Sequence, residues 1–423
     1  MSIEGTRMRL PLGGGLWLAP LAAAWVAAMA LGAVGVFERV VNGHEGANYT
    51  SYIPWGLWVA LYVYFIGLSA GSFLVSALVY VLGVKRLEPL GKLALFTALV
   101  TLLAALLAIW LDLGHFERFW EVLTRGNPLS MMAWIVWLYT AYFLLLSIEF
   151  WFAMRGDLVE WSRRPGIQGA LASALLLGQT DASAEARAAD RRVLRVLGAL
   201  GVPLAVGFHG GVGALFGVVG ARDYWNAPLY PLMFIVAALA SGGGLLTFLA
   251  AFFGPRRGTA EHRDMVTFLG QMTMGLLVVY LIMLWAEISI PLYSDIPAET
   301  KPFEHVLTGP QPWIFWGFQI AMGSVIPLAI FVLRPRSVRW LGLASLLVAG
   351  AFLATRYNIV IPGLVLPELE GLPTAYADRR LSFSYAPSVS EWLVFVFIAA
   401  LAVGIFYAGY RLLPVVTEKE AES

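Results

Sequence analysis

Long apolar segments alternate with short polar ones along all 423 residues. A helix needs about 20 apolar residues to cross the hydrocarbon core of a bilayer. Backbone groups in lipid must be paired within a helix or a closed barrel, so segments of this kind favour helices over open strands. The pattern therefore predicts an all-α integral membrane protein, a single polytopic membrane domain over residues 1–423. We expect about ten transmembrane helices, at roughly 15–37, 54–83, 91–113, 131–153, 193–219, 227–253, 265–290, 312–333, 338–361 and 389–412.

Two segments need a separate interpretation. Residues 15–37 exceed the length of a signal-peptide apolar region and have no clear cleavage site, so we interpret them as a retained span. Residues 154–192 contain the run DASAEARAADRR. We expect this linker to form a short surface helix or a loose connection, and not a folded domain.

Composition supports a membrane location. Hydrophobic residues make up 59% of the chain and charged residues 13%, against about 25% charged in soluble domains. The 16 Trp and 16 Tyr suit the two headgroup levels. A net charge of +1 gives no field to attract nucleic acid, and the absence of cysteine excludes disulfides and Cys-ligated clusters within this chain.

The basic residues predict an orientation. With ten spans, both termini lie on one side, and that side holds 20 of the 28 Lys and Arg residues. The positive-inside rule then places both termini in the cytoplasm, and we expect a bacterial inner membrane. The connections expected on the outer side carry the aromatic residues, prolines and isolated charges, whereas the inner ones are mostly arginine, which suggests a site or a partner on the periplasmic face.

Ionisable residues within membrane spans are costly and often functional. Four of them are expected near the outer level, together with the turn that begins at Arg222 and Asp223; the four are Asp112, Glu287, Arg356 and Glu391. Helices in a bundle can bring such groups together as an acid–base cluster. The alternative is that each side chain extends separately to the headgroups.

Two further residues lie deeper. His209 is in the middle of the fifth span, among glycines that allow close backbone approach, and it either exchanges protons or is a hydrogen-bonded packing residue. Only His209 of the five histidines is well inside a span, so we expect no haem and no metal. Glu149 shares a helix face with Tyr142, and the two form a possible proton path from the inside. A bond from Glu149 to an arginine such as Arg155 is the alternative.

Several stretches, taken in order, resemble the polysulfide reductase membrane subunit family, also called the NrfD-like family. The likeness is greatest to its ten-helix branch, which includes the membrane subunit of quinone-linked nickel–iron hydrogenase. One departure is His115, where many relatives have Arg. The stretches are IPWGLWVALYVYFIGLSAGSF (53–73), LDLGHFERFW (111–120), NPLSMMAW (127–134), VPLAVGFHGGVGALFG (202–217), YWNAPLYPLMFIVAALASGG (224–243), WAEI (285–288) and RYNIVIPG to YAPSVSEW (356–392).

The resemblance implies two four-helix bundles with flanking helices and a quinone pocket near the outer surface, for menaquinone or ubiquinone. It also implies an iron–sulfur subunit on the periplasmic face, joined to a molybdopterin enzyme, a hydrogenase or a multihaem cytochrome. By position in the matching stretches, the resemblance implies these quinone-binding or proton-exchanging residues: Asp112, His115, His209, Arg222, Asp223, Tyr224, Trp225, Glu287, Arg356 and Asn358.

We therefore predict a quinone-binding membrane anchor of a respiratory oxidoreductase. Electrons would pass between the quinone pool and the iron–sulfur partner, with no electron-carrying centre in this chain and with proton translocation as a further hypothesis. A secondary transporter is one alternative, although its polar groups should lie near the midplane in two related halves. A purely structural anchor is the other.

Overall fold

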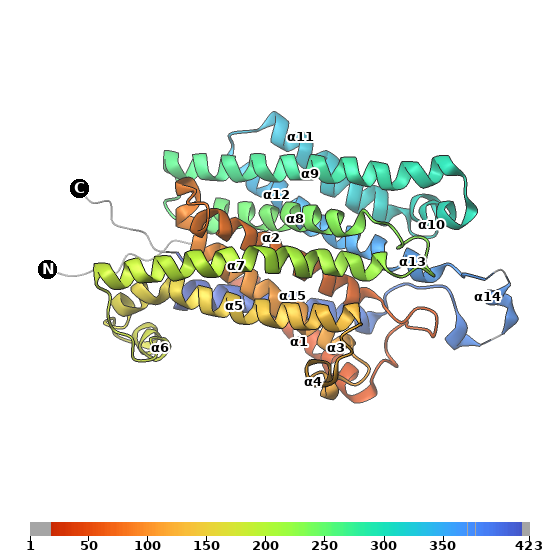
Figure 1. Ribbon diagram of the computed structural model, residues 1–423, viewed down its shortest axis with the longest axis horizontal. Coiled ribbons are helices and arrows are strands. Elements are labelled where there is room, and N and C mark those ends of the chain that lie inside the picture. The colour runs from red at the N-terminus through yellow and green to blue at the C-terminus, as the bar shows by residue number, and fades with distance from the viewer. Residues whose placement is uncertain (1–17, 370, 377, 417–423) are drawn as a thin grey trace.

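The computed structural model describes residues 18–369, 371–376 and 378–416, which form helices joined by loops and contain no strand (Figure 1). Ten helical segments of this part are long and apolar enough to cross a membrane, which confirms the predicted all-α membrane fold. Their bounds are α1 Leu18–Asn42, α2 Leu57–Tyr80, α3 Gly91–Asp112, α5 Met131–Trp161, α7 Ala184–Gly217, α8 Tyr230–Phe253, α9 Ala260–Ser294, π-helical η3 Ile314–Val325 continued by α11 Ile326–Leu333, α12 Val338–Val360 and α15 Val389–Leu412.

The membrane helices pack as two groups of four with two flanking helices. Helices α2, α3, α5 and α7 form one closed group, and α8, α9, η3–α11 and α12 form the other. Helix α1 packs along α15, which in turn contacts α3 and α2. Helix α2 is central: it also packs against α8 and α12 and is buried over most of its length.

The two bundles meet where α2 crosses α8. A Cβ atom added at Gly71 would lie 2.0 Å from the carbonyl oxygen of Ala238, and one added at Gly242 would lie 2.6 Å from Cα of Gly71. The two backbones are therefore in direct contact, an approach that small residues allow in membrane helices. Any side chain larger than hydrogen at this crossing would push the bundles apart.

Short elements mark the two ends of the molecule. The end at which α6 lies is called the inner end, and the end at which α10, α13 and α14 lie is called the outer end (Figure 1). The short elements are η1 Lys85–Leu90, η2 Phe116–Arg118, α4 Glu121–Arg125, α6 Ile167–Leu175, α10 Pro297–Thr308, α13 Pro362–Val365, α14 Leu372–Ala375 and η4 Arg379–Leu381.

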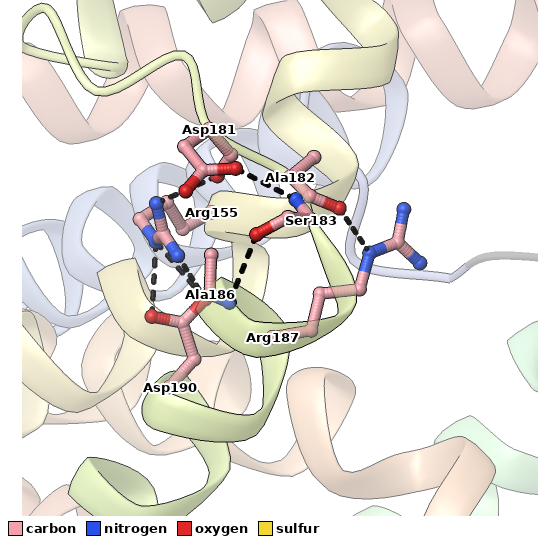
Figure 2. Close-up of polar contacts among 7 residues, drawn as sticks. All are labelled: Arg155, Asp181, Ala182, Ser183, Ala186, Arg187 and Asp190. Atoms are coloured by element: carbon pink, nitrogen blue, oxygen red, sulfur yellow. Dashed lines mark hydrogen bonds and ion pairs between the residues drawn. The ribbon is translucent and has the colours of Figure 1, made fainter.

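The segment 154–192 contains more helix than a loose linker would. Helix α5 continues to Trp161 and α7 begins at Ala184, with α6 between them. Figure 2 shows the contacts that hold this region: Arg155 of α5 pairs with Asp190 of α7 and donates through Nη1 to the carbonyl of Asp181. Ser183 caps α7 by accepting from the backbone N–H of Ala186. The helices extend beyond the apolar runs because this cap and ion pair stabilise them in water.

We predict that Arg155→Ala destabilises the protein strongly. The pair has an Nη2–Oδ2 distance of 2.7 Å and both side chains are about one-tenth exposed, so the variant leaves the carboxylate of Asp190 buried without its cation. The free energy of unfolding, measured by denaturant titration in detergent micelles, should fall by about 3 kcal/mol.

The matched control is Arg187→Ala, which removes an exposed pair with Glu160 and should change the free energy of unfolding by less than about 1 kcal/mol. Equal losses in the two variants would contradict the role assigned to the Arg155–Asp190 pair.

Candidate functional site

The outer end of α3 carries a carboxylate held by a tyrosine. The hydroxyl of Tyr49 donates to Oδ1 of Asp112 at 2.6 Å. Nε2 of His44 lies 3.0 Å from the backbone carbonyl oxygen of Asp112. Since a carbonyl oxygen only accepts, Nε2 carries the proton in neutral His44 and Nδ1 has the lone pair. The burial of His44, helped by the positive charge of Arg39, lowers its pKa below the ordinary 6.5, so the neutral form prevails.

Arg39 fixes the end of the same helix. Its Nε donates to the carbonyl of Leu111 at 2.6 Å and its Nη2 to that of Leu113 at 2.5 Å. These are carbonyls at the C-terminal end of a helix, where intrahelical donors run out. The guanidinium also lies 5.9 Å from the ring centroid of Trp58 and 5.5 Å from that of Phe116. Arg39 therefore places its charge beside Asp112 while bonding to the backbone.

A second carboxylate, that of Glu391, lies near Tyr49 and Asp112. Glu391, at the start of α15, is fully buried and accepts a short hydrogen bond from the hydroxyl of Tyr385. Burial and this carboxylate raise the pKa of Tyr385, which keeps the phenol neutral. The rings of Tyr385 and Tyr49 have centroids 6.5 Å apart. We call the whole set the Asp112 cluster, which consists of Arg39, His44, Tyr49, Trp58, Asp112, Tyr385 and Glu391.

The outer end of α12 directs three consecutive side chains to three neighbours. Arg356 is buried with its Cζ 4.4 Å from the ring centroid of Phe234. The hydroxyl of Tyr357 donates to Oε1 of Gln311 at 2.8 Å. Nδ2 of Asn358 donates to Oε1 of Gln319 at 2.8 Å. Gln319 lies in the π-helical η3, a geometry often found at functional sites.

His209 and Arg356 face a space without a side chain. His209 is buried, and neither of its ring nitrogens has a hydrogen-bond partner; Nη2 of Arg356 also lacks one. A Cβ atom added at Gly67 would lie 3.5 Å from Nη2 of Arg356, 3.6 Å from Cε1 of His209 and 3.7 Å from Oγ of Ser241. The glycine leaves room at the point where these polar groups meet.

Glu287 of α9 lines a separate hollow. This hollow lies between α8, α9, α10, η3 and α12, and it includes Tyr224, Tyr280 and Asn358. Its volume is about 20 Å³, which is room for about one water molecule. The hollow does not include Asp112. The structure thus separates the two outer carboxylates. The hollow is lined on α12 by Thr355, Asn358 and Ile359, the neighbours of Arg356 along that helix, while His209 lies near Arg356 beside Gly67.

The other predicted residues have various surroundings. The side chain of His115 is 72% exposed and Nδ1 lies 3.1 Å from Oε1 of Glu117. Arg222 pairs with Glu368, and Asp223 is exposed. Tyr224 and Trp225 donate to the backbone carbonyls of Asn358 and Ile359 at 2.5 and 2.7 Å, and so attach the turn after α7 to α12.

Glu149 is buried far from the outer end. Its side chain is fully buried and neither carboxyl oxygen has a partner. The alternative of a bond to Arg155 is wrong, because Arg155 pairs with Asp190. Tyr142, two turns away on the same helix, is buried with its ring 4.8 Å from that of Phe208, and its hydroxyl lies 3.5 Å from Oγ of Ser69.

Sequence reasoning missed most of the Asp112 cluster. It named Asp112 and noted Glu391 as an ionisable residue at the outer level, but not Arg39, His44, Tyr49 or Tyr385. Arg39 interrupts a hydrophobic helix just before the run NGHEGANY, and that was the available signal.

Comparison with known proteins identifies the family. The model of the family described as Polysulphide reductase, NrfD matches residues 45–368.

This chain belongs to the NrfD family.

Three relatives match nearly their whole length. The chain is 37% identical to a selenate reductase subunit of Mesobacillus selenatarsenatis, covering 92% of each chain. It is 32% identical to the Hdr-like menaquinol oxidoreductase integral membrane subunit of Archaeoglobus fulgidus, covering 93% of each. It is 25% identical to the menaquinone reductase integral membrane subunit of Nitratidesulfovibrio vulgaris, covering 92% of this chain and 90% of the relative.

The NrfD match includes only part of the Asp112 cluster. Tyr49, Trp58 and Asp112 lie within residues 45–368. The flanking helices α1 and α15, with the segments next to them, supply the members outside this range, which are Arg39, His44, Tyr385 and Glu391. In this NrfD protein, Asp112 therefore comes from the matched region, while α1, α15 and the segments next to them supply much of what surrounds its carboxylate.

We predict that His44→Gln makes stability less sensitive to acid. Because the pKa of His44 is lower in the folded protein than its ordinary 6.5, the unfolded chain binds more protons as the pH falls below about 7, and folding loses stability. Between about pH 8 and about pH 5, the melting temperature of the wild type should fall further than that of the variant. Parallel profiles for the two proteins would show that His44 does not titrate in this way.

Proposed function

We propose that this NrfD protein is the quinone-reactive membrane subunit of a respiratory reductase complex. It exchanges electrons between the membrane quinone pool and an iron–sulfur partner on the periplasmic side of a bacterial inner membrane. The arrangement that carries the proposal is Tyr49, His44 and Asp112 side by side at the outer end of α3. The names of two relatives, a menaquinol oxidoreductase subunit and a menaquinone reductase subunit, support it and favour menaquinone over ubiquinone.

The Asp112 cluster has the groups that a quinone headgroup requires. A quinone or quinol exchanges two protons per cycle, and its carbonyls need hydrogen-bond donors. The hydroxyl of Tyr49 supplies a donor, Nδ1 of neutral His44 supplies a base, and Arg39 supplies positive charge next to any anionic form. Asp112 can exchange the proton with Tyr49 across their hydrogen bond. His44, Tyr49 and Asp112 are only partly buried, so the cluster is reachable from the interface.

The Glu287 hollow fits this role less well. Its volume of about 20 Å³ is far below the 300–1,000 Å³ of ligand pockets. We assign Glu287, His209, Arg356 and Asn358 to proton exchange, because they are polar groups at membrane depth, some of them without partners. The turn from Arg222 to Trp225 is assigned to holding α12 in place.

An iron–sulfur partner would dock beside the Asp112 cluster. The segment after α3 exposes Phe119, Trp120 and Leu123, each between 42% and 53% accessible. Large exposed aromatic side chains outside the bilayer are typical of protein interfaces. A partner bound to η2 and α4 would bring its clusters near the quinone site, and a catalytic subunit would complete the complex. In this proposal the outer end faces the periplasm and both termini face the cytoplasm, as the distribution of Lys and Arg predicts.

Proton translocation is a second proposal, supported by Glu149. A buried carboxylate without partners is costly unless it takes up a proton or water. Glu149, Tyr142, Ser72 and His209 are buried polar groups in the bundle of α2, α3, α5 and α7, and three of the four have side-chain oxygens or nitrogens without a partner. They would form the inner part of a proton path that continues to Arg356.

We predict that Asp112→Asn and Tyr49→Phe lower quinone-linked turnover by about 100-fold, because each removes a proton-exchanging group while keeping the shape of the side chain. His209→Ala should also lower turnover. Turnover is measured on the purified complex with a water-soluble quinone analogue. The control is Tyr52→Phe, since Tyr52 stacks on Phe383 outside the cluster and should retain turnover within about twofold.

A complex that assembles normally and keeps full turnover in both Asp112→Asn and Tyr49→Phe would refute the quinone site and favour a purely structural anchor. Uptake of a solute by the isolated chain in liposomes would favour a transporter.

We predict that Glu149→Gln lowers the number of protons moved per electron without abolishing electron transfer, because an amide cannot carry a proton. The measurement is the ratio of proton movement to quinone turnover in proteoliposomes. Ser147→Ala is the control, as Ser147 bonds to its own helix backbone. An unchanged ratio in Glu149→Gln would remove Glu149 from the proposed path.

A further inference from the structure

We propose that this protein binds an anionic phospholipid in a groove at its inner end, separate from the quinone site. The groove has a volume of about 790 Å³ and lies between α7 and α9, with α2 and α8 as its floor. A polar cleft with several basic residues lies next to the inner end of the groove, about one helical turn away along α9. An apolar channel followed by a cationic cleft matches the chemistry of an acyl chain followed by a phosphate.

The groove is lined almost entirely by apolar side chains. Its walls include Leu82 at the end of α2, Ala199 and Pro203 of α7, and Leu276 of α9; Thr273 is the single lining residue with a polar side chain. Small residues keep it open: a Cβ atom added at Gly275 would meet nothing within 4 Å. In a membrane this groove is filled by a hydrocarbon chain, because water gains no hydrogen bonds there.

The polar cleft begins one helical turn beyond the groove. On α9, the groove reaches Leu269 and the cleft includes Met265, four residues earlier. Along the chain after α2, the groove reaches Leu82 and the cleft includes Lys85. The cleft has a volume of about 320 Å³, which is enough for a charged headgroup.

The charge at this end favours an anion. The cleft contains Lys85, Arg86 and Arg256 with the carboxylates of Glu261 and Asp264. Glu261 is paired with Arg256. Lys85 and Arg86 are exposed, and the guanidinium of Arg86 lies 5.2 Å from the ring centroid of Phe268. The carboxylates near these two cations are Asp264 in the cleft and Glu88 on the same short helix η1. Arg195 adds a fourth cation on α7, one turn before Ala199 and on the same helix face. Each basic residue near a membrane surface strengthens binding of anionic lipid severalfold.

Other occupants fit less well. A quinone tail is less well placed, because the groove lies between α7 and α9, whereas α1, α3 and α15 contribute the charged side chains of the Asp112 cluster. A helix of a partner protein could fill the apolar groove, but it would leave the basic residues next to the groove without a role. In the proposed orientation the lipid would belong to the cytoplasmic leaflet, but the inference itself depends only on the groove and the cleft.

The test uses the purified intact complex in detergent and native mass spectrometry with two lipids of equal chain length, dioleoylphosphatidylglycerol and dioleoylphosphatidylcholine. The wild type should bind phosphatidylglycerol roughly tenfold more tightly than phosphatidylcholine. The double variant Lys85→Gln/Arg86→Gln should lose most of this preference. Its control, Arg334→Gln/Arg336→Gln, removes two exposed arginines in another loop at the inner end and should keep the preference.

A second pair of variants tests the groove itself. Gly275→Leu should fill it and lower binding of both lipids by at least fivefold. Gly350→Leu places the same side chain in α12, where a Cβ atom also meets nothing within 4 Å, and should leave binding unchanged. Equal affinity for the two lipids in the wild type, or unchanged lipid binding in Gly275→Leu, would overturn the proposal. Loss of bound quinone in Gly275→Leu with lipid binding intact would also overturn it and assign the groove to a quinone tail.

Discussion

The whole structure depends on one constraint: a polar group that leaves water must find its partner inside the protein. Arg39 shows how the constraint is met. A cation near the membrane boundary bonds to the last carbonyls of α3 and lies between aromatic rings. The same contact brings α1 against the end of α3 and positions the backbone around Asp112. Arg39 thus gives its own charge hydrogen-bond partners, bonds the free carbonyls at the end of α3 and holds the flanking helix α1 in place.

The exceptions to the constraint are few among the described residues. Five buried side chains have polar atoms without partners: Ser72, Glu149, His209, Ser345 and Arg356. Four of them, all except Ser345, belong to the proton path proposed above. Elsewhere the described serines and threonines of the core mostly bond to their own helix backbone, as Thr97 and Thr247 do. A buried polar side chain without a hydrogen-bond partner destabilises the fold, so it is usually kept for a function. Binding and releasing protons is one such function.

The sequence predicted the helices well because apolar length alone determines them. It also found Asp112, His209, Glu287 and Arg356, since ionisable residues are conspicuous in apolar runs. It could not predict that Asp112 and Glu287 lie in different clusters, because shared depth in a membrane says nothing about which helices are neighbours. It missed His44 and Tyr49 because they lie in a connection, where polar and aromatic residues are expected at any membrane surface. The extra turns of α5 and α7 escaped it because an ion pair between distant residues stabilises them.

The glycine crossing of α2 and α8 has a mechanical consequence. At Gly71 and Gly242 the two backbones touch without an intervening layer of side chains, and interlocked surfaces of this kind do not slide past one another in small steps. Rocking of one bundle against the other, on which alternating access depends, would have to break this contact. The two bundles are thus joined at their centre by direct backbone contact, and the proton path proposed above does not require them to separate there.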